Sequence, residues 1–175
     1  MKPRMLTLAA VACAFVAPVS AEQQSVPYAG QQSRPIKALS DEDTAALLNG
    51  DGMGFARAAE LNGYPGPAHV LTLSQQLKLT EAQREQVQAI FDRMSAAAKL
   101  LGAELVERER ALDQLFAKGD ITPDRLAGAT AQIGELQGRL RSVHLAAHVE
   151  TQAVLTSDQI ALYQHLRGYG HPHHG

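Results

Sequence analysis

The sequence predicts an all-α fold, built as a long antiparallel helical hairpin with short flanking helices. Two long stretches repeat apolar residues at alternating spacings of four and three, which is typical of helices that pack along a partner. A short turn signal separates these stretches, and no segment reads as a strand. The phrase L-T-x-x-Q also occurs twice, at 79–83 and at 155–159, on either side of the hairpin.

The first long helix is expected to begin after Thr80 and to end near Gly119, which can adopt the left-handed conformation that follows a helix. Its apolar positions form one seam for a partner helix. The seam consists of Val87, Phe91, Met94, Ala98, Leu101, Leu105, Leu112 and Leu115.

The second long helix is expected to begin after Thr122, which can cap it, with Pro123 at its first position. Each helix should have about 30 residues and a length of roughly 45 Å. Two such helices cannot bury both flanks of their seams, so a further partner is needed, either a second copy or the N-terminal arm. The second seam consists of Leu126, Ala129, Ile133, Leu136, Leu140, Val143, Ala147 and Val154.

Each L-T-x-x-Q phrase predicts the start of a helix. The threonine can act as N-cap, with its hydroxyl accepting a hydrogen bond from the first turn, and the glutamine three residues later can reach back to the threonine N–H. The preceding leucine can pack on the helix as a hydrophobic staple. These motif residues are Leu79, Thr80 and Gln83 in the first copy and Leu155, Thr156 and Gln159 in the second.

Residues 1–21 have the pattern of a secretory signal peptide. Lys2 and Arg4 precede an apolar run over 5–16, and small residues at 19–21 suit a signal peptidase. The run is too short to cross about 30 Å of hydrocarbon, so we expect export and no membrane span.

Cys13 raises the alternative of a lipid-attached N-terminus. The pattern disfavours it, because Ala10 stands where a large aliphatic residue is expected and the apolar run continues beyond the cysteine. Removal of the signal peptide would leave no cysteine, which excludes disulfides and thiolate metal ligands.

Composition and motifs argue against several classes of protein. Without Lys2 and Arg4, 14 Lys and Arg face 18 Asp and Glu, giving a net charge of −4 and no nucleic-acid footprint. No G-x-S-x-G or H-E-x-x-H motif occurs, and the glycine-rich 50–54 segment lacks the lysine of a phosphate loop. We therefore expect no enzyme.

Residues 22–68 are expected to form a polar segment followed by an interrupted helical arm. The 22–38 segment is rich in Gln, Ser, Pro and Gly and is predicted to be disordered. Short helices are predicted to about residue 48 after a Ser40 N-cap, over 55–61 and over 68–77. Such an arm would not be stable alone and must lie on the hairpin.

Six of the seven histidines occur in the last 32 residues. His144 and His148 are four residues apart on one helix face, a spacing that suits metal ligation by imidazole, and His69 or Glu60 of the arm could supply a third ligand. Because seam residues adjoin them, we expect both rings on the flank of the core, where they could instead bond a neighbouring helix or water. The histidine-rich tail, 169–175, could bind metal or simply be solvated.

Two L-T-x-x-Q phrases around a hairpin behind an export signal resemble the Spy/CpxP family of periplasmic proteins. The resemblance covers roughly residues 69–167, which predicts a domain of this family over 69–168, and it leaves 22–68 unexplained. It implies a periplasmic homodimer shaped as a cradle, acting as an ATP-independent chaperone or envelope-stress adaptor. Its partners would be unfolded client proteins or an envelope sensor protein, with no cofactor required. Related periplasmic proteins sense or bind metals, so the alternative is a heavy-metal sensor or binding protein holding a Zn, Ni or Co ion.

Overall fold

The computed structural model describes residues 27–169, and within these the chain from residue 31 to residue 169 belongs to one unit. This unit is all-helical, without strands among the residues described, which confirms the predicted fold class. The predicted signal peptide and nearly all of the histidine-rich tail lie outside these residues. The helices are α1 (Asp41–Asn49), α2 (Arg57–Glu60), α3 (Pro67–Thr72), α4 (Glu81–Ala117), α5 (Pro123–Val154) and α6 (Ser157–Leu166).

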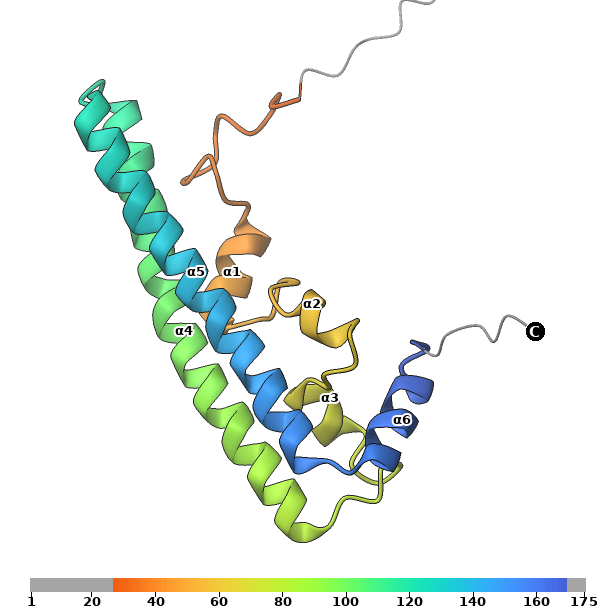
Figure 1. Cartoon of the computed structure of the whole chain (residues 1–175). Coiled ribbons are helices and arrows are strands. Elements are labelled where there is room, and N and C mark those ends of the chain that lie inside the picture. The colour runs from red at the N-terminus through yellow and green to blue at the C-terminus, as the bar shows by residue number, and fades with distance from the viewer. Residues whose placement is uncertain (1–26, 170–175) are drawn as a thin grey trace, which may run out of the picture. The chain divides into compact units, whose positions relative to one another are not determined.

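Helices α4 and α5 form the predicted antiparallel hairpin (Figure 1). Gly119 follows α4 with φ 71°, and the Thr122 side chain accepts a hydrogen bond from the N–H of Arg125 at the start of α5. Leucines of the two seams, Leu101 and Leu140 among them, are buried in one apolar cluster. Towards the turn the seam opens, because Leu126 is exposed.

The arm lies along one side of the hairpin, with α1, α2 and α3 following one another down its length (Figure 1). Helix α1 approaches α4 closely at Gly102, where an added Cβ would lie 2.0 Å from the carbonyl oxygen of Leu47. The arm therefore covers a flank of the seams within a single chain.

The residues before α1 correct the prediction of disorder where they are described. Ile36 is buried in the same cluster as Leu101, and the backbone N–H of Lys37 donates to Asp113 Oδ1 at 3.0 Å. The Lys37 ammonium also pairs with that carboxylate at 3.2 Å. One apolar anchor and one charged pair thus hold a segment whose polar composition suggested no structure.

Two helices of the arm are shorter than predicted. The helix expected over 55–61 is only the single turn of α2, and the one expected over 68–77 ends at Thr72. The chain then makes a series of turns to Lys78, which has a φ of 50°. These turns bring Leu77 into a second apolar cluster. Leu77 is thus buried by turns of the chain, and not by the longer helix that the spacing of the leucines predicted.

Both L-T-x-x-Q phrases form capping boxes. The hydroxyl of Thr80 accepts from the N–H of Gln83 at 3.2 Å, and the Thr80 N–H donates to Gln83 Oε1 at 3.1 Å. The corresponding distances for Thr156 and Gln159 are 3.3 and 3.0 Å. The second box turns the chain out of α5 into α6, which packs on the second apolar cluster of Val70, Leu77, Val87, Leu155 and Tyr163. Across residues 27–169, none of the helices has both the length and the apolar character that crossing a membrane requires.

Candidate functional site

The paired histidines of α5 lie beneath the arm. His144 and His148 are 3% and 9% exposed, because the arm covers the flank of the seam on which both rings were expected. They line a cavity of about 280 Å³ between arm and hairpin, together with His69 of α3, Asp51 of the α1–α2 loop and Met94 of α4. The structure thus gathers the three histidines singled out in the sequence around one hollow.

The ring of His148 is oriented by the loop after α2. Its Nδ1 lies 2.8 Å from the carbonyl oxygen of Tyr64, and since a carbonyl only accepts, Nδ1 carries the proton. In the neutral ring Nε2 then keeps its lone pair. A side chain at position 66 would displace this ring, because a Cβ there would lie 2.8 Å from its Cε1.

His144 has a nitrogen without a partner. Its ring stacks on Phe55 at a centroid distance of 5.9 Å, and its Nε2 is buried with no hydrogen bond to any described residue. Burial, and to a lesser degree the neighbouring His148, lowers the pKa of His144, so the ring is neutral at neutral pH. A buried nitrogen without a hydrogen-bond partner lowers the stability of the fold. It also remains available to coordinate a ligand.

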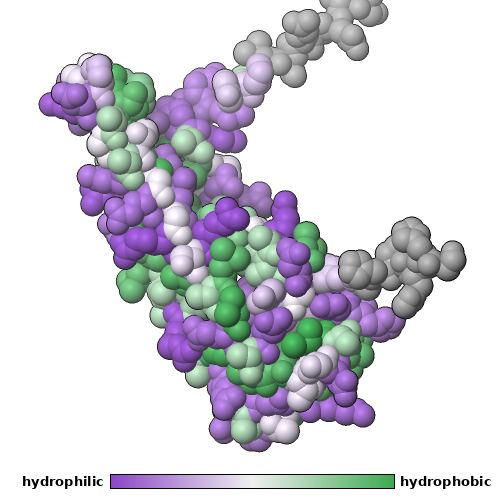
Figure 2. Space-filling model, viewed as in Figure 1, coloured by the Kyte–Doolittle hydropathy of each residue, from purple (hydrophilic) through white to green (hydrophobic). Residues whose placement is uncertain are grey.

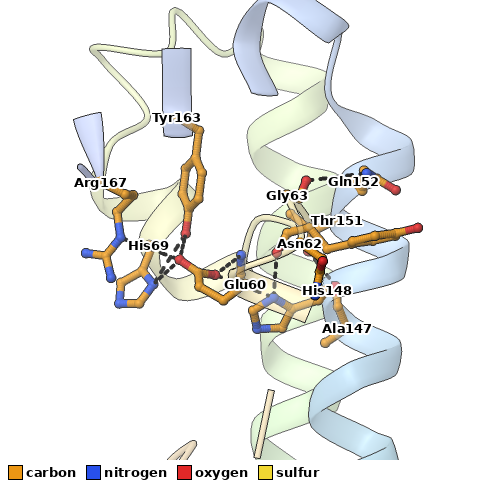
Figure 3. A network of polar contacts seen from close by, with 12 residues as sticks. Glu60, Asn62, Gly63, His69, Ala147, His148, Thr151, Gln152, Tyr163 and Arg167 are labelled. Carbon is orange, nitrogen blue, oxygen red and sulfur yellow. Dashed lines mark hydrogen bonds and ion pairs between the residues drawn. The ribbon is translucent and has the colours of Figure 1, made fainter. Parts of the chain in front are cut away.

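A largely buried carboxylate, that of Glu60, lies beside two of these histidines, His69 and His148 (Figure 3). Its Oε1 accepts a hydrogen bond of 2.6 Å from the Tyr163 hydroxyl, and its Oε2 accepts from the N–H of Gly66 at 3.2 Å. Three cationic or ionisable side chains surround it as well. They are His148 (Nδ1 to Oε2, 3.6 Å), His69 (Nδ1 to Oε1, 3.7 Å) and Arg167 (Nε to Oε1, 3.5 Å).

The network favours particular protonation states. Burial and the hydrogen bond to Glu60 raise the pKa of Tyr163 well above its usual range, so its hydroxyl remains a donor. Burial, assisted by the charge of Arg167, lowers the pKa of His69, against the opposing effect of Glu60. His69 is half exposed, and it is the most accessible of the three cavity histidines.

The donor set suits a borderline transition metal, since it offers imidazole nitrogens and carboxylate oxygens. Within residues 27–169, however, no three His, Cys, Asp or Glu side chains converge closely enough to hold an ion. The two imidazole nitrogens on α5 therefore need a third donor that moves closer, and His69 on the short α3 is an accessible candidate that lines the same cavity.

Sequence reasoning found some of this site and missed the rest. The i, i+4 spacing revealed His144 and His148, and His69 and Glu60 were both named as arm candidates. Tyr163 and Arg167 were missed, as was the Tyr64 carbonyl, which no side-chain pattern reveals. A feature of the sequence that could have indicated this part of the site is Tyr163, an aromatic residue one helical turn after Gln159.

The fold and the site define a class of protein, an all-helical hairpin whose arm covers paired histidines. A model of the heavy-metal resistance family matches residues 45–161, more than half of the chain, so the protein belongs to this family. The matched segment begins in α1 and includes residues that the sequence resemblance left unexplained. No curated protein and no solved structure matches the chain.

Proposed function

We propose that this protein binds a transition-metal ion such as Zn²⁺, Ni²⁺ or Co²⁺, with Nε2 of His144 and Nε2 of His148 as its first two ligands. The observation that carries the proposal is the buried and unpartnered Nε2 of His144. Buried polar atoms of native proteins almost always have a hydrogen-bond partner, so this nitrogen requires an explanation, and a bound ion would supply one. Membership of the heavy-metal resistance family supports the same conclusion.

The second ligand is prepared in the manner usual for metal-binding histidines. Such rings commonly donate their other N–H to a carbonyl or carboxylate, and His148 donates to the Tyr64 carbonyl. Binding would draw in a third donor from the arm, with His69 first and the carboxylates of Glu60 and Asp51 as alternatives. An arm that moves on binding is what a metal-responsive sensor or a metal buffer requires.

We propose that this activity is periplasmic, on the basis of the export pattern at residues 1–21. The sequence contains neither a G-x-S-x-G nor an H-E-x-x-H motif, and the role that we propose is binding or sensing of the ion. In this proposal the ion is the ligand that is sensed, and no resident cofactor is invoked.

Calorimetric titration of the mature protein with Zn²⁺, Ni²⁺ and Co²⁺ tests the proposal. Deletion of 171–175 removes the histidines of the tail as a competing site, and one site should remain. We expect His144→Ala and His148→Ala each to abolish it, without additivity, because either loss leaves a single imidazole. His69→Ala should weaken binding, whereas His165→Ala, at an exposed position of α6, should not.

The pH dependence of that titration adds a second criterion. Both imidazoles must be neutral to bind, so affinity should fall in acid. Because burial lowers the pKa of His144, that ring should become protonated only below about pH 6.5, the ordinary histidine value. Metal bound only while the tail is present would reject the cavity as the site.

A chaperone of the Spy/CpxP type is the second candidate, favoured by the outer surface of the hairpin. Leu100 is 75% exposed there and lines an open hollow of about 520 Å³ with Val143 and Ala146, between charges from Glu104 and Arg139. All residues lining this hollow come from α4 and α5. Figure 2 shows how apolar patches alternate with polar side chains on the face in view. Such a surface would bind apolar segments of unfolded proteins weakly, without nucleotide.

Light scattering from a heat-stressed or reduced client tests this second function. Leu100→Glu should lose suppression of aggregation, while Leu48→Glu, at an exposed leucine of α1, should retain it. Light scattering coupled to gel filtration on the same variants tests the expected homodimer, since Leu100 would be covered if a second copy used this surface. No suppression by the wild type at tenfold excess would leave metal binding as the proposed function.

A further inference from the structure

Tyr163 joins the C-terminal helix α6 to the histidine cavity. It is almost fully buried, and its hydroxyl donates to Glu60 Oε1 at 2.6 Å. This is the shortest contact that the Glu60 carboxylate makes. Tyr163 lies beyond the segment that the family model matches, so family membership says nothing about it.

Glu60 needs such a partner to hold its position. It is the last residue of α2, a helix of four residues that has no side-chain cap. The neighbouring Arg167 Nε lies 3.5 Å from Oε1 but makes no hydrogen bond. The Tyr163 hydroxyl and the Gly66 N–H are therefore the groups that fix the direction of the carboxylate.

Two hydrogen bonds of the loop 61–66 connect Glu60 to His148 (Figure 3). Glu60 Oε2 accepts from the N–H of Gly66 at 3.2 Å, which closes this loop into a ring. The closed loop presents the Tyr64 carbonyl to His148 Nδ1 at 2.8 Å. The proton of His148 is thus held on Nδ1 by a loop whose shape depends on Glu60.

The rotation of α6 is set by the second L-T-x-x-Q phrase. Gln159 lies one helical turn before Tyr163, so the two side chains share a face. The Nε2 of Gln159 donates to the Leu77 carbonyl at 3.2 Å, which anchors this face against the rest of the protein. The ring of Tyr163 packs in the second apolar cluster, and its hydroxyl emerges at Glu60.

We propose that Tyr163 is a positioning residue for the histidine site, acting through Glu60 and the loop 61–66 to keep Nε2 of His148 free for a ligand. Where the ligand is a metal ion, this inference rests on the proposed function. Occupancy of the site and docking of α6 are then coupled, and the coupling is reciprocal: bound metal slows the local opening of α6, and loss of the hydroxyl weakens metal binding.

The test uses the full mature chain and the substitution Tyr163→Phe, which keeps the ring and removes the hydroxyl. In the metal-free protein we expect faster amide exchange at Gly66, and ring ¹⁵N shifts of His148 that show a larger share of the Nε2-protonated form. The matched control is Val87→Ala, which removes buried packing from the same apolar cluster and leaves the hydroxyl in place. The control should lower the melting temperature without changing either signal.

The metal-loaded protein gives the second readout. Tyr163→Phe should weaken Zn²⁺ binding about tenfold, the usual lower end for loss of an outer hydrogen bond at a metal site. Bound Zn²⁺ should also slow amide exchange in α6 of the wild type more than in Tyr163→Phe.

The outcomes separate this inference from the proposed function. Unchanged Gly66 and His148 signals in Tyr163→Phe overturn it, whether or not zinc binds, and so do changes of equal size in Val87→Ala. If those signals change as expected while the wild type binds no metal, the positioning role of Tyr163 is upheld and the proposed metal function fails.

Discussion

The side-chain amides of Gln83 and Gln159 hydrogen-bond to each other across the start of two helices. Nε2 of Gln83 donates to Oε1 of Gln159 at 2.9 Å, and Nε2 of Gln159 donates to Oε1 of Gln83 at 3.1 Å. Gln83 also donates to the Val154 carbonyl at the end of α5, at 3.0 Å. Since each Oε1 also closes its own capping box, the two L-T-x-x-Q phrases form one joint that ties α4, α5 and α6 together.

This joint predicts that the two glutamines act as a unit. Gln83→Ala and Gln159→Ala should each lower the free energy of unfolding by about 1 to 2 kcal/mol, because each leaves a partner amide or a carbonyl unpaired. The double substitution should cost less than the sum, by about 0.5 kcal/mol or more, as for other residues in contact. Urea denaturation of the four proteins of this cycle measures the difference.

The threonines of the same phrases are the control. Thr80→Ala and Thr156→Ala should each cost about 1 kcal/mol through loss of an N-cap. Each hydroxyl serves its own helix, so these two costs should add. If the free-energy costs of the two glutamine substitutions also add, the reciprocal amide pair contributes nothing to stability.

The local signals in the sequence predicted the hairpin well. Gly119, Thr122 and Pro123 define a turn by backbone preferences that need no knowledge of the rest of the chain. The seams are equally local, because helical periodicity shows which side of a helix is apolar. The position of the arm was not predictable in this way, since burial of Ile36 and the close approach at Gly102 depend on surfaces distant in sequence.

The candidate site was predictable only in part for the same reason. His144 and His148 are one turn apart on a single helix, so their pairing is visible in the sequence. Tyr163 and Glu60 are 103 residues apart, and their hydrogen bond exists only because α6 folds back beside α2 and α3. A spacing rule cannot find a carboxylate whose partners come from three other elements.

The contact between α1 and α4 predicts opposite effects for two glycine substitutions. Gly102→Ala should lower stability by about 3 kcal/mol, because its Cβ would lie 2.0 Å from the Leu47 carbonyl oxygen and α1 would have to move away. Gly138→Ala has no atom within 4 Å of the new Cβ and should raise stability by about 0.5 to 1 kcal/mol. Thermal melts compare the two variants, and equal stabilities would contradict the packing of α1 at Gly102.

Stability should decrease between neutral and mildly acidic pH. Burial lowers the pKa of both His69 and His144 in the folded protein. As the pH falls below about 6.5 the unfolded chain takes up protons that the folded protein does not, so the free energy of unfolding falls with pH. Urea denaturation between pH 8 and 5 measures this slope.

The carboxylates act in a separate pH range. Hydrogen bonds from Lys37 hold the pKa of Asp113 below its usual value, and those from Ser40 do the same for Asp43. Their contribution is present above about pH 4, the unfolded carboxyl pKa, and is lost on further acidification.

A loss of stability as the pH falls from 7 to 5 is therefore assigned to histidines, because the partly buried Glu109, whose pKa is raised by burial, acts in the opposite direction. His144→Leu should reduce this loss. A stability that does not change between pH 7 and 5 would show that these rings are not held neutral.

The same variant, His144→Leu, should be more stable than the wild type when metal is absent. Leucine removes the buried Nε2 that has no hydrogen-bond partner and keeps an apolar side chain beside Phe55, so we expect a gain of about 1 kcal/mol. Added Zn²⁺ should stabilise only the wild type, by an amount that grows with the ratio of free metal to the dissociation constant. Thermal melts with and without zinc should therefore show the order of stability reversing.

His165→Leu provides the matched control, because His165 is exposed on α6 and should change neither the metal-free stability nor the zinc response. The reversal distinguishes two roles for His144. A residue retained for binding lowers the stability of the empty protein and raises that of the loaded one. If His144→Leu is less stable than the wild type without metal, the ring serves the packing between the arm and α5, and the unpartnered nitrogen is not evidence for a ligand.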